Sequence, residues 1–119
     1  MEKRGFILCV CQGTCPSFQK MDIFGVLSDV RREKLFDHVC LHPQLCVEDG
    51  EEFLKALLSG KGTDKLYVAA CDPRMQEKMF RDAFDAAGFD RSRLVSLDIR
   101  GKSTEEAVEA IKGMGARAA

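Results

Sequence analysis

The sequence predicts an α/β fold, in which one domain is built on a four-stranded, mainly parallel sheet with helices on both faces. Strand-like and helix-like segments alternate four times within 119 residues. The segment KLYVAAC (Lys65–Cys71) is a nearly continuous apolar run, as in a strand that is buried on both faces. Because successive β-α units give parallel strands with right-handed crossovers, we expect residues 1–119 to form one domain of this class.

The first half of the chain supplies two strands and the helix between them. The stretch Gly5–Phe18, GFILCVCQGTCPSF, begins as a short buried strand and then breaks into a cysteine-bearing loop. Met21–Lys34 predicts a helix, because its apolar residues recur every three or four positions and its last turn is basic. Phe36–Leu41 predicts a second strand, which ends near His42 because Pro43 follows.

The middle of the chain repeats this pattern. Val47–Ser59 predicts a second helix with one apolar face, and the glycines that follow it end the helix. Within it, Gly50 is expected to serve a turn or a close approach of another segment. The strand Lys65–Cys71 comes next, and Pro73 then begins a third helix that runs to Ala87.

A fourth unit completes the predicted domain. Arg93–Ile99 predicts the last strand, and Ser103–Met114 predicts the last helix. Ser103 and Glu106 have the spacing of a capping box, in which each side chain accepts a hydrogen bond from the other's backbone. We expect the tail, Gly115–Ala119, to fray.

Four of the six cysteines fall where the predicted topology would gather them. Cys9 and Cys11 leave the first strand, Cys46 lies between the second strand and the second helix, and Cys71 closes the third strand. In open sheets of this kind, ligands collect outside the carboxyl ends of the strands. The sequence therefore predicts a cluster of thiols at one edge of the sheet.

Thiolate chemistry narrows what such a cluster could bind. Four cysteine sulfurs suit zinc or an iron–sulfur cluster, and helix N-termini after Cys46 and Cys71 would lower thiol pKa values. The C-x2-C pairs of zinc sites and the spacing of ferredoxins are both absent. In the alternative interpretation, Cys9 and Cys71 are core thiols at strand ends and the other cysteines are incidental. Independently of this choice, Cys40, between two apolar residues, is expected in the core.

Three segments resemble the N-terminal domain of the flavin and iron–sulfur subunit of heterodisulfide reductase, which belongs to electron-bifurcating complexes in anaerobes. CVCQG (residues 9–13) resembles the C-x-C-G turn of that domain, and LCVEDGEEFL (residues 45–54) is similar to its M-C-S-x-P-G-Q-x-x-I segment. VAACDPRMQEKMFR (residues 68–81) is similar to its V-A-A-C-S-P-R-M-H-E-x-x-F-R. Ile99 and Arg100 follow where the family has N-I-R, so the resemblance covers roughly residues 5 to 100.

The resemblance implies a redox domain in which Cys9, Cys11, Cys46 and Cys71 hold a [4Fe–4S] cluster. The family continues after N-I-R with E-Q-C-S-W-V-H, whereas this chain reads GKSTEE (residues 101–106), so one further family cysteine has no counterpart. Cys15 could replace it as a ligand or act as a resolving thiol.

Arg74, three residues after Cys71, is a further candidate site residue. It could donate a hydrogen bond to a cluster sulfide or to an anionic substrate, or pair with a carboxylate.

The large flavin-binding domain of the family does not follow in this sequence. No G-x-G-x-x-G motif occurs either, so we expect no FAD on this chain. The chain is then a free-standing relative or an isolated domain, whose partners would be larger oxidoreductase subunits carrying flavin or iron–sulfur centres.

Charge and composition limit the other classes of function. The chain has 18 Lys and Arg residues and 19 Asp and Glu residues, which gives a net charge of -1. This balance provides no basic surface field to attract nucleic acid, so we do not expect nucleic acid as a partner. The start, MEKRGFILCVCQG, has too few apolar residues for a signal peptide or a membrane span, so we expect a cytoplasmic location.

Three functions remain open from the sequence. The chain could be an electron-transfer module with an iron–sulfur cluster, a thiol–disulfide protein using Cys9, Cys11 or Cys15, or a zinc-binding or metal-free interaction domain. No acid–base constellation suggests independent catalysis, which favours a component of an oxidoreductase complex.

Overall fold

The computed structural model of the chain describes residues 3–10, 15–45, 47–60 and 62–117. Its strands are β1 (Arg4–Cys9), β2 (His38–His42), β3 (Lys65–Ala70) and β4 (Leu94–Asp98). Its helices are α1 (Ile23–Arg32), α2 (Glu48–Ser59), α3 (Pro73–Ala87) and α4 (Thr104–Arg117), with short 3-10 turns η2 (Pro16–Phe18) and η3 (Arg91–Arg93).

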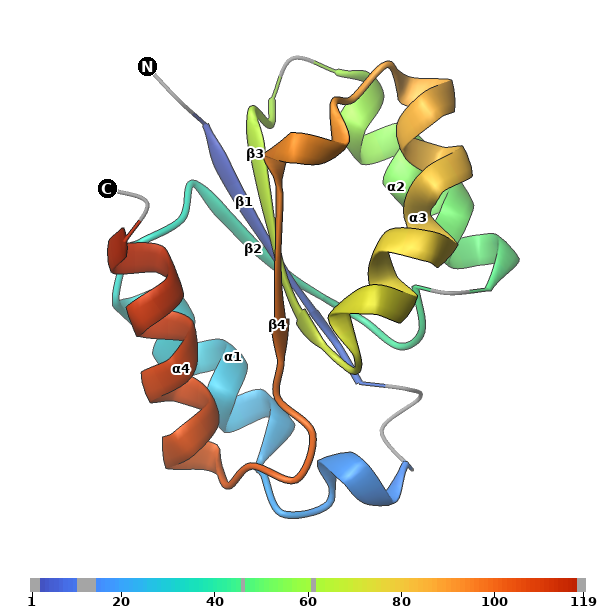
Figure 1. Cartoon of the computed structure of the whole chain (residues 1–119). Coiled ribbons are helices and arrows are strands. Elements are labelled where there is room, and N and C mark those ends of the chain that lie inside the picture. The colour runs from blue at the N-terminus through green and yellow to red at the C-terminus, as the bar shows by residue number, and fades with distance from the viewer. Residues whose placement is uncertain (1–2, 11–14, 46, 61, 118–119) are drawn as a thin grey trace.

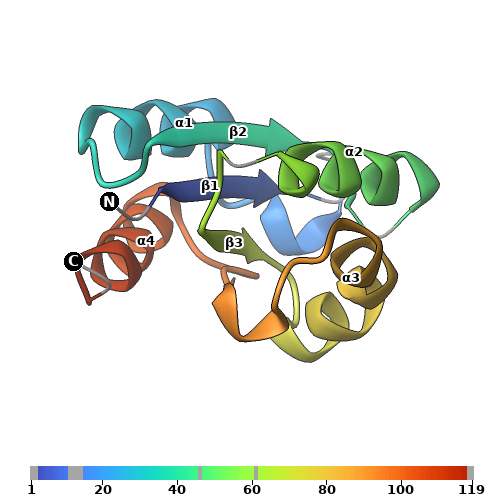
Figure 2. The ribbon, with the colours of Figure 1, turned by 90° about the horizontal axis from the view of Figure 1, so that it is seen from above.

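The predicted fold class is confirmed. The four strands form one all-parallel sheet in the order β2-β1-β3-β4, and helices cover both of its faces (Figure 1). Helices α1 and α4 contact each other on one face, and α2 and α3 contact each other on the opposite face (Figures 1 and 2). Among the described helices, none is long and apolar enough to cross a membrane.

The strand order reverses between β1 and β3. From β1 the chain steps outward to β2, and then crosses back to place β3 on the other side of β1, with β4 beyond it. In register, Leu8 of β1 lies beside Ala69 of β3, and Cys9 lies beside His42 of β2. The loops that leave β1 and β3 therefore separate at a topological switch point, where open α/β sheets bind their ligands.

Two apolar clusters hold the layers together, because successive side chains of a strand point to opposite faces of the sheet. Phe6, Leu8 and Tyr67 pack with α1 and α4, whereas Ile7 and Val68 pack with α2 and α3. All five side chains are fully buried, so the central strands β1 and β3 contribute to both clusters. This shared core fixes the relative positions of the two strand ends.

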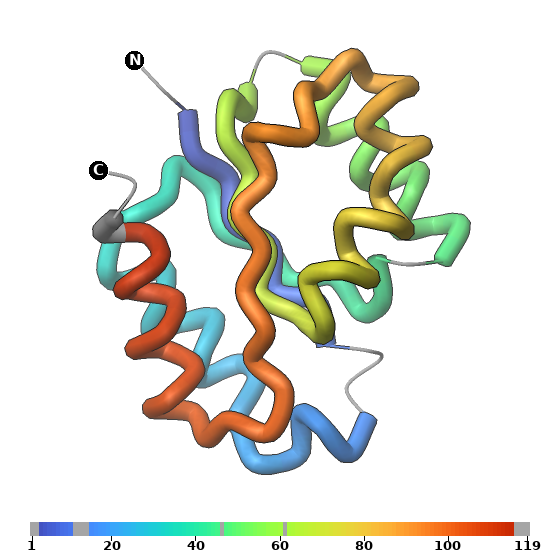
Figure 3. The backbone as a smooth tube through the Cα atoms, viewed as in Figure 1, coloured from blue at the N-terminus to red at the C-terminus, as the bar shows by residue number. Residues whose placement is uncertain are grey.

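Most predicted boundaries agree with the structure to within a few residues. The third helix spans Pro73–Ala87 as predicted, and Gly88 ends it in the left-handed region with φ +69°. The expectation that the tail frays from Gly115 was wrong for the described part, because α4 continues to Arg117. The Arg4 side chain from the start of β1 donates a hydrogen bond to the Gly115 carbonyl, which holds the end of α4 near the sheet. The backbone trace shows the start of β1 and the end of α4 at the same end of the molecule (Figure 3).

Candidate functional site

Two of the predicted site cysteines, Cys9 and Cys71, lie at the switch point. Cys9 is the last residue of β1, and Cys71 directly follows the adjacent strand β3. Both side chains line one small pocket of about 50 Å³, together with Leu45, Ala70, Met75, Gln76, Met79 and Phe80. The structure therefore brings together two thiols that are 62 positions apart in the sequence.

The segment that leads to Cys46 also reaches this pocket. Cys9 is 6% exposed, and its Sγ accepts a hydrogen bond of 3.3 Å from the backbone N–H of Leu45. Backbone N–H donors commonly support sulfur atoms that act as metal or cluster ligands, and this contact places one at Cys9. Leu45 is itself buried at 2% exposure, which fixes the backbone next to Cys46.

Cys11 and Cys46, the other two predicted ligands, lie outside the described residues. Within the described ranges there is no group of three or more His, Cys, Asp or Glu side chains placed to hold a metal ion. Two thiols in one apolar pocket fit soft-metal or iron–sulfur chemistry as part of a ligand set. Cys11, two residues after Cys9, and Cys46, next to Leu45, are the cysteines nearest in sequence to that pocket.

Gln76 supports the loop that carries Cys71. Its Nε2 donates a 2.8 Å hydrogen bond to the Cys71 carbonyl, and the residue is only 3% exposed. Its Oε1 is buried without a hydrogen-bond partner in the described part of the chain. A buried unpaired amide oxygen costs free energy, so Gln76 carries a polar group that no other described residue satisfies.

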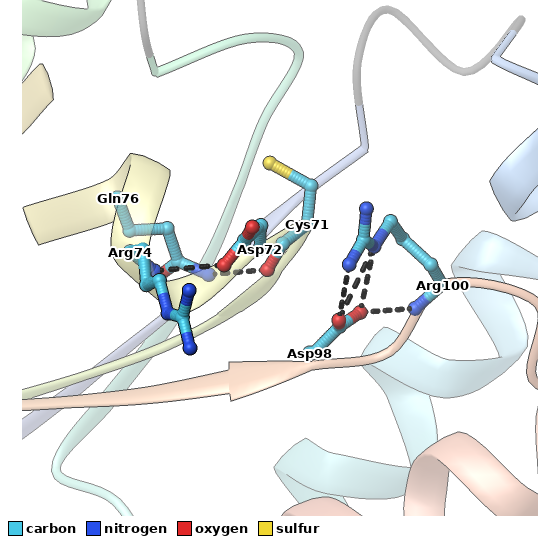
Figure 4. Close-up of polar contacts among 6 residues, drawn as sticks. All are labelled: Cys71, Asp72, Arg74, Gln76, Asp98 and Arg100. Atoms are coloured by element: carbon cyan, nitrogen blue, oxygen red, sulfur yellow. Dashed lines mark hydrogen bonds and ion pairs between the residues drawn. The ribbon is translucent and has the colours of Figure 1, made fainter.

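The turn after Cys71 begins α3. The Asp72 side chain accepts a hydrogen bond from the Arg74 N–H and so caps the helix, while Pro73 occupies its first turn. Figure 4 shows Gln76 and the Asp72 cap on one side of Cys71 and an ion pair between Asp98 and Arg100 on the other.

Arg100 is a neighbour of the site whose position the sequence did not predict. Its guanidinium donates to both oxygens of Asp98, with a shortest distance of 2.6 Å. This pairing lowers the pKa of Asp98 and raises that of Arg100, to which Asp72 and Cys71 add smaller contributions. Arg100 therefore lies near Cys71 with its guanidinium engaged by Asp98 (Figure 4).

The remaining predicted candidates lie elsewhere. Cys15 is half-buried and packs against the core cluster on the α1 and α4 side, whereas Cys9 belongs to the cluster on the other face. Cys71 also packs against the cluster that Cys15 contacts. Cys40 is half-buried inside β2, where its Sγ donates to the Phe6 carbonyl and burial raises the pKa of the thiol. Arg74 lines a different, larger pocket between α3 and the segment formed by η3 and the start of β4.

Comparison with known proteins gives the same family that the sequence motifs resemble. No family model matches the chain. The chain is 27% identical over 88 residues to the iron-sulfur subunit of the CoB–CoM heterodisulfide reductase of Methanocaldococcus jannaschii. The match covers 65% of this chain and 13% of that protein.

Two further relatives carry similar names. The chain is 32% identical to one subunit of the H2/formate:CoB-CoM heterodisulfide,ferredoxin reductase of Methanococcus maripaludis. This match extends over 59 residues, which are 50% of the chain and 9% of the relative. The chain is 34% identical to the corresponding subunit of the ferredoxin/F420H2-dependent CoB-CoM heterodisulfide reductase of Methanosarcina acetivorans. This match extends over 56 residues, which are 47% of the chain and 7% of the relative.

These matches support a domain related to this heterodisulfide reductase subunit. The chain spans about a tenth of the length of these curated relatives.

Proposed function

We propose that this chain is a redox module of a heterodisulfide-reductase-like system and holds an iron–sulfur cluster, [4Fe–4S] in type, through Cys9, Cys11, Cys46 and Cys71. The observation that carries the proposal is the pocket shared by Cys9 and Cys71 at the switch point of the sheet. The name of the Methanocaldococcus jannaschii relative, an iron-sulfur subunit, supports it. When bound, the cluster would supply one-electron transfer at a potential set by its surroundings.

The described residues around the two thiols suit that role. The Leu45 N–H donates a hydrogen bond to Cys9 Sγ, and backbone donors of this kind stabilise a sulfur that acts as a cluster ligand. The other pocket side chains are mainly apolar, which restricts water. We propose that the partners are larger oxidoreductase subunits, that residues 1–119 act as one domain, and that the chain is a component rather than an independent catalyst.

The test is the metal and sulfide content of protein purified without oxygen, read together with its visible spectrum. About four irons and four acid-labile sulfides per chain, with broad absorption near 400 nm, are expected for one cluster of this type. Reduction should bleach that absorption and give a paramagnetic signal. About one zinc per chain would replace the proposal with a structural metal site, and a folded anaerobic sample without metal would refute it.

Cysteine variants then test the ligand set. Cys9→Ser and Cys71→Ser should each lower the iron content severely, and Cys11→Ser and Cys46→Ser should do the same. The matched control is Cys40→Ser, because Cys40 lies in the interior of β2 and does not line the pocket. Equal iron loss in the control and in the four site variants would contradict the assignment.

A further inference from the structure

A second pocket lies between α3 and the segment formed by η3 and the start of β4, and none of the described cysteines lines it. It has a volume of about 550 Å³, which is within the range of small-molecule sites. Arg74, Lys78 and Arg81 line it from α3, and Arg91 lines it from η3 at the start of β4. We call it the basic groove. Arg74 is thus separated from the cysteine pocket, which is lined by Met75, Gln76 and Met79 of the same helix.

The charges of the basic groove are poorly balanced. Four cationic side chains face one carboxylate, Glu77, and none of the five makes a salt bridge within the described part of the chain. Asp90 offsets the adjacent Arg91 in part: hydrogen bonds from Ser92 lower the pKa of the Asp90 carboxyl, and Arg93 and Arg91 add smaller contributions. The whole chain has a net charge of -1, so this positive region is local.

The spacing of the cations suits a ligand with more than one anionic group. Positions 74, 78 and 81 follow one face of a helix and span roughly 10 Å along its axis. Three of the four cations are arginines, whose planar guanidinium groups bind phosphate through two parallel hydrogen bonds. Ser92 adds a hydroxyl group to the same pocket.

The groove favours a small polyanion over an acidic protein surface. Protein interfaces depend on exposed aromatic or aliphatic anchors, but the apolar groove residues Phe84 and Leu94 are 1% exposed and half-buried, respectively. The large apolar side chains that α3 does expose, Met75 at 50% and Met79 at 42%, line the cysteine pocket instead.

We propose that the basic groove binds a small molecule carrying two or more phosphate groups, such as a nucleoside diphosphate or triphosphate. This site goes beyond the proposed redox function and does not depend on the cluster. Metal-free protein with reduced thiols should therefore bind the ligand.

The experiment is an NMR titration of the isotope-labelled, metal-free chain with tripolyphosphate, ATP and orthophosphate. Saturable shifts are expected for the amides of residues 74–81 and 91–94. Tripolyphosphate should bind at least about tenfold more tightly than orthophosphate, because it engages additional charged hydrogen bonds. ATP binding tighter than tripolyphosphate would support the proposal with a nucleoside contact, and equal affinity would support it with phosphate contacts alone.

Charge variants distinguish this groove from diffuse surface attraction. Arg81→Gln should weaken tripolyphosphate binding by about tenfold, whereas Glu77→Gln should strengthen it severalfold by removing the carboxylate. A gain in affinity cannot come from unfolding. The control is Arg31→Gln on α1, an exposed helical arginine that makes no salt bridge among the described residues.

Three outcomes would overturn the proposal. They are unsaturated shifts spread over the surface, the same weakening in Arg31→Gln as in Arg81→Gln, and binding of an eight-residue glutamate peptide at the groove without binding of tripolyphosphate. The last result would assign the groove to protein docking. None of these outcomes bears on iron content, so failure here is distinguishable from failure of the proposed redox function.

Discussion

At the scale of single residues, Gly50 links a helix to the cysteine pocket. It is buried in α2, and a Cβ atom at this position would lie 2.3 Å from the Leu45 carbonyl oxygen and 2.5 Å from the Leu45 Cα. The obstacle is backbone, which cannot rotate away as a side chain can. The Leu45 N–H donates a hydrogen bond to Cys9 Sγ, so any shift of this backbone changes that hydrogen bond.

We therefore predict that Gly50→Ala destabilises the fold by about 2 kcal/mol, as expected for overpacking. Urea unfolding measures this change. The matched control is Gly113→Ala, because Gly113 is an exposed helical residue of α4 whose Cβ would meet open space. Replacement of a helix-interior glycine there should stabilise the chain by about 0.5–1 kcal/mol. Equal effects at both positions would contradict the close approach at Gly50.

The sequence predicted part of this arrangement. A glycine within an apolar-faced helix indicated a turn or a close approach, and the structure confirms a close approach. The partner, Leu45, was not predictable, because it depends on the path of the loop between β2 and α2 rather than on helical periodicity. The same limit applies to Arg100, whose position beside Cys71 requires β4 to be the neighbour of β3.

Cys40 gives a prediction for pH dependence at the same scale. Burial raises the pKa of its thiol above the ordinary value of 9.0, so the thiolate fraction stays small until the pH rises above that value. Alkylation of Cys40 in the native protein should therefore be slower at pH 8 than in urea-unfolded protein, and the difference should shrink as the pH rises. Peptide mapping by mass spectrometry measures both rates. Equal rates at pH 8 would show that Cys40 is not shielded.

At the scale of elements, the start of α4 is defined by a reciprocal capping box. Ser103 N–H donates to Glu106 Oε1 at 2.9 Å, and Glu106 N–H donates to Ser103 Oγ at 3.2 Å. The sequence predicted both contacts, because a capping box involves only residues three positions apart. Contacts between residues this close in sequence can be predicted without the tertiary structure. The two pockets lined by different faces of α3 cannot, because they depend on how α3 packs.

We predict that Ser103→Ala lowers stability by about 1 kcal/mol at neutral pH, as loss of an N-cap usually does. The hydrogen bond from the Ser103 N–H lowers the pKa of Glu106 below its ordinary 4.5. A lowered pKa in the folded state stabilises the fold above pH 4.5, and that contribution is lost as the pH falls through the folded pKa.

The stability difference between the wild type and Glu106→Gln should accordingly be present at neutral pH and vanish well below pH 4.5. Urea unfolding at both pH values measures it. Glu105→Gln is the control, since Glu105 occupies the same first turn and has no hydrogen bond to Ser103 in the described chain. A pH dependence as large for Glu105→Gln would assign the effect to the helix dipole alone.

At the scale of the whole molecule, the strand order is what the sequence could not provide. Alternating β-α units predicted a parallel sheet, but several strand orders satisfy that pattern. The observed order β2-β1-β3-β4 makes β1 and β3 neighbours and so brings Cys9 and Cys71 into one pocket. The location of the thiols at the carboxyl edge of the sheet was predictable from chain direction. Their placement in the same pocket depends on long-range packing.

That packing predicts cooperative folding without metal. The central strands β1 and β3 contribute to both core clusters, so neither face can unfold while the other keeps its native packing. The radius of gyration of 13.2 Å is close to the ~13.5 Å expected for a compact domain of this length. The described thiols proposed as ligands, Cys9 and Cys71, lie at one edge of this core. We therefore expect the metal-free, reduced chain to unfold in a single two-state transition.

The buried Tyr67 makes this prediction measurable, since it is the only tyrosine and the chain has no tryptophan. Its near-ultraviolet circular dichroism reports packing on the α1 and α4 side, while far-ultraviolet circular dichroism reports all helices. The two urea transitions should coincide, with the same midpoint and slope. Separate transitions would show that the two faces fold independently. A metal-free chain with helical signal but no tyrosine signal would show that bound metal is needed to order the core.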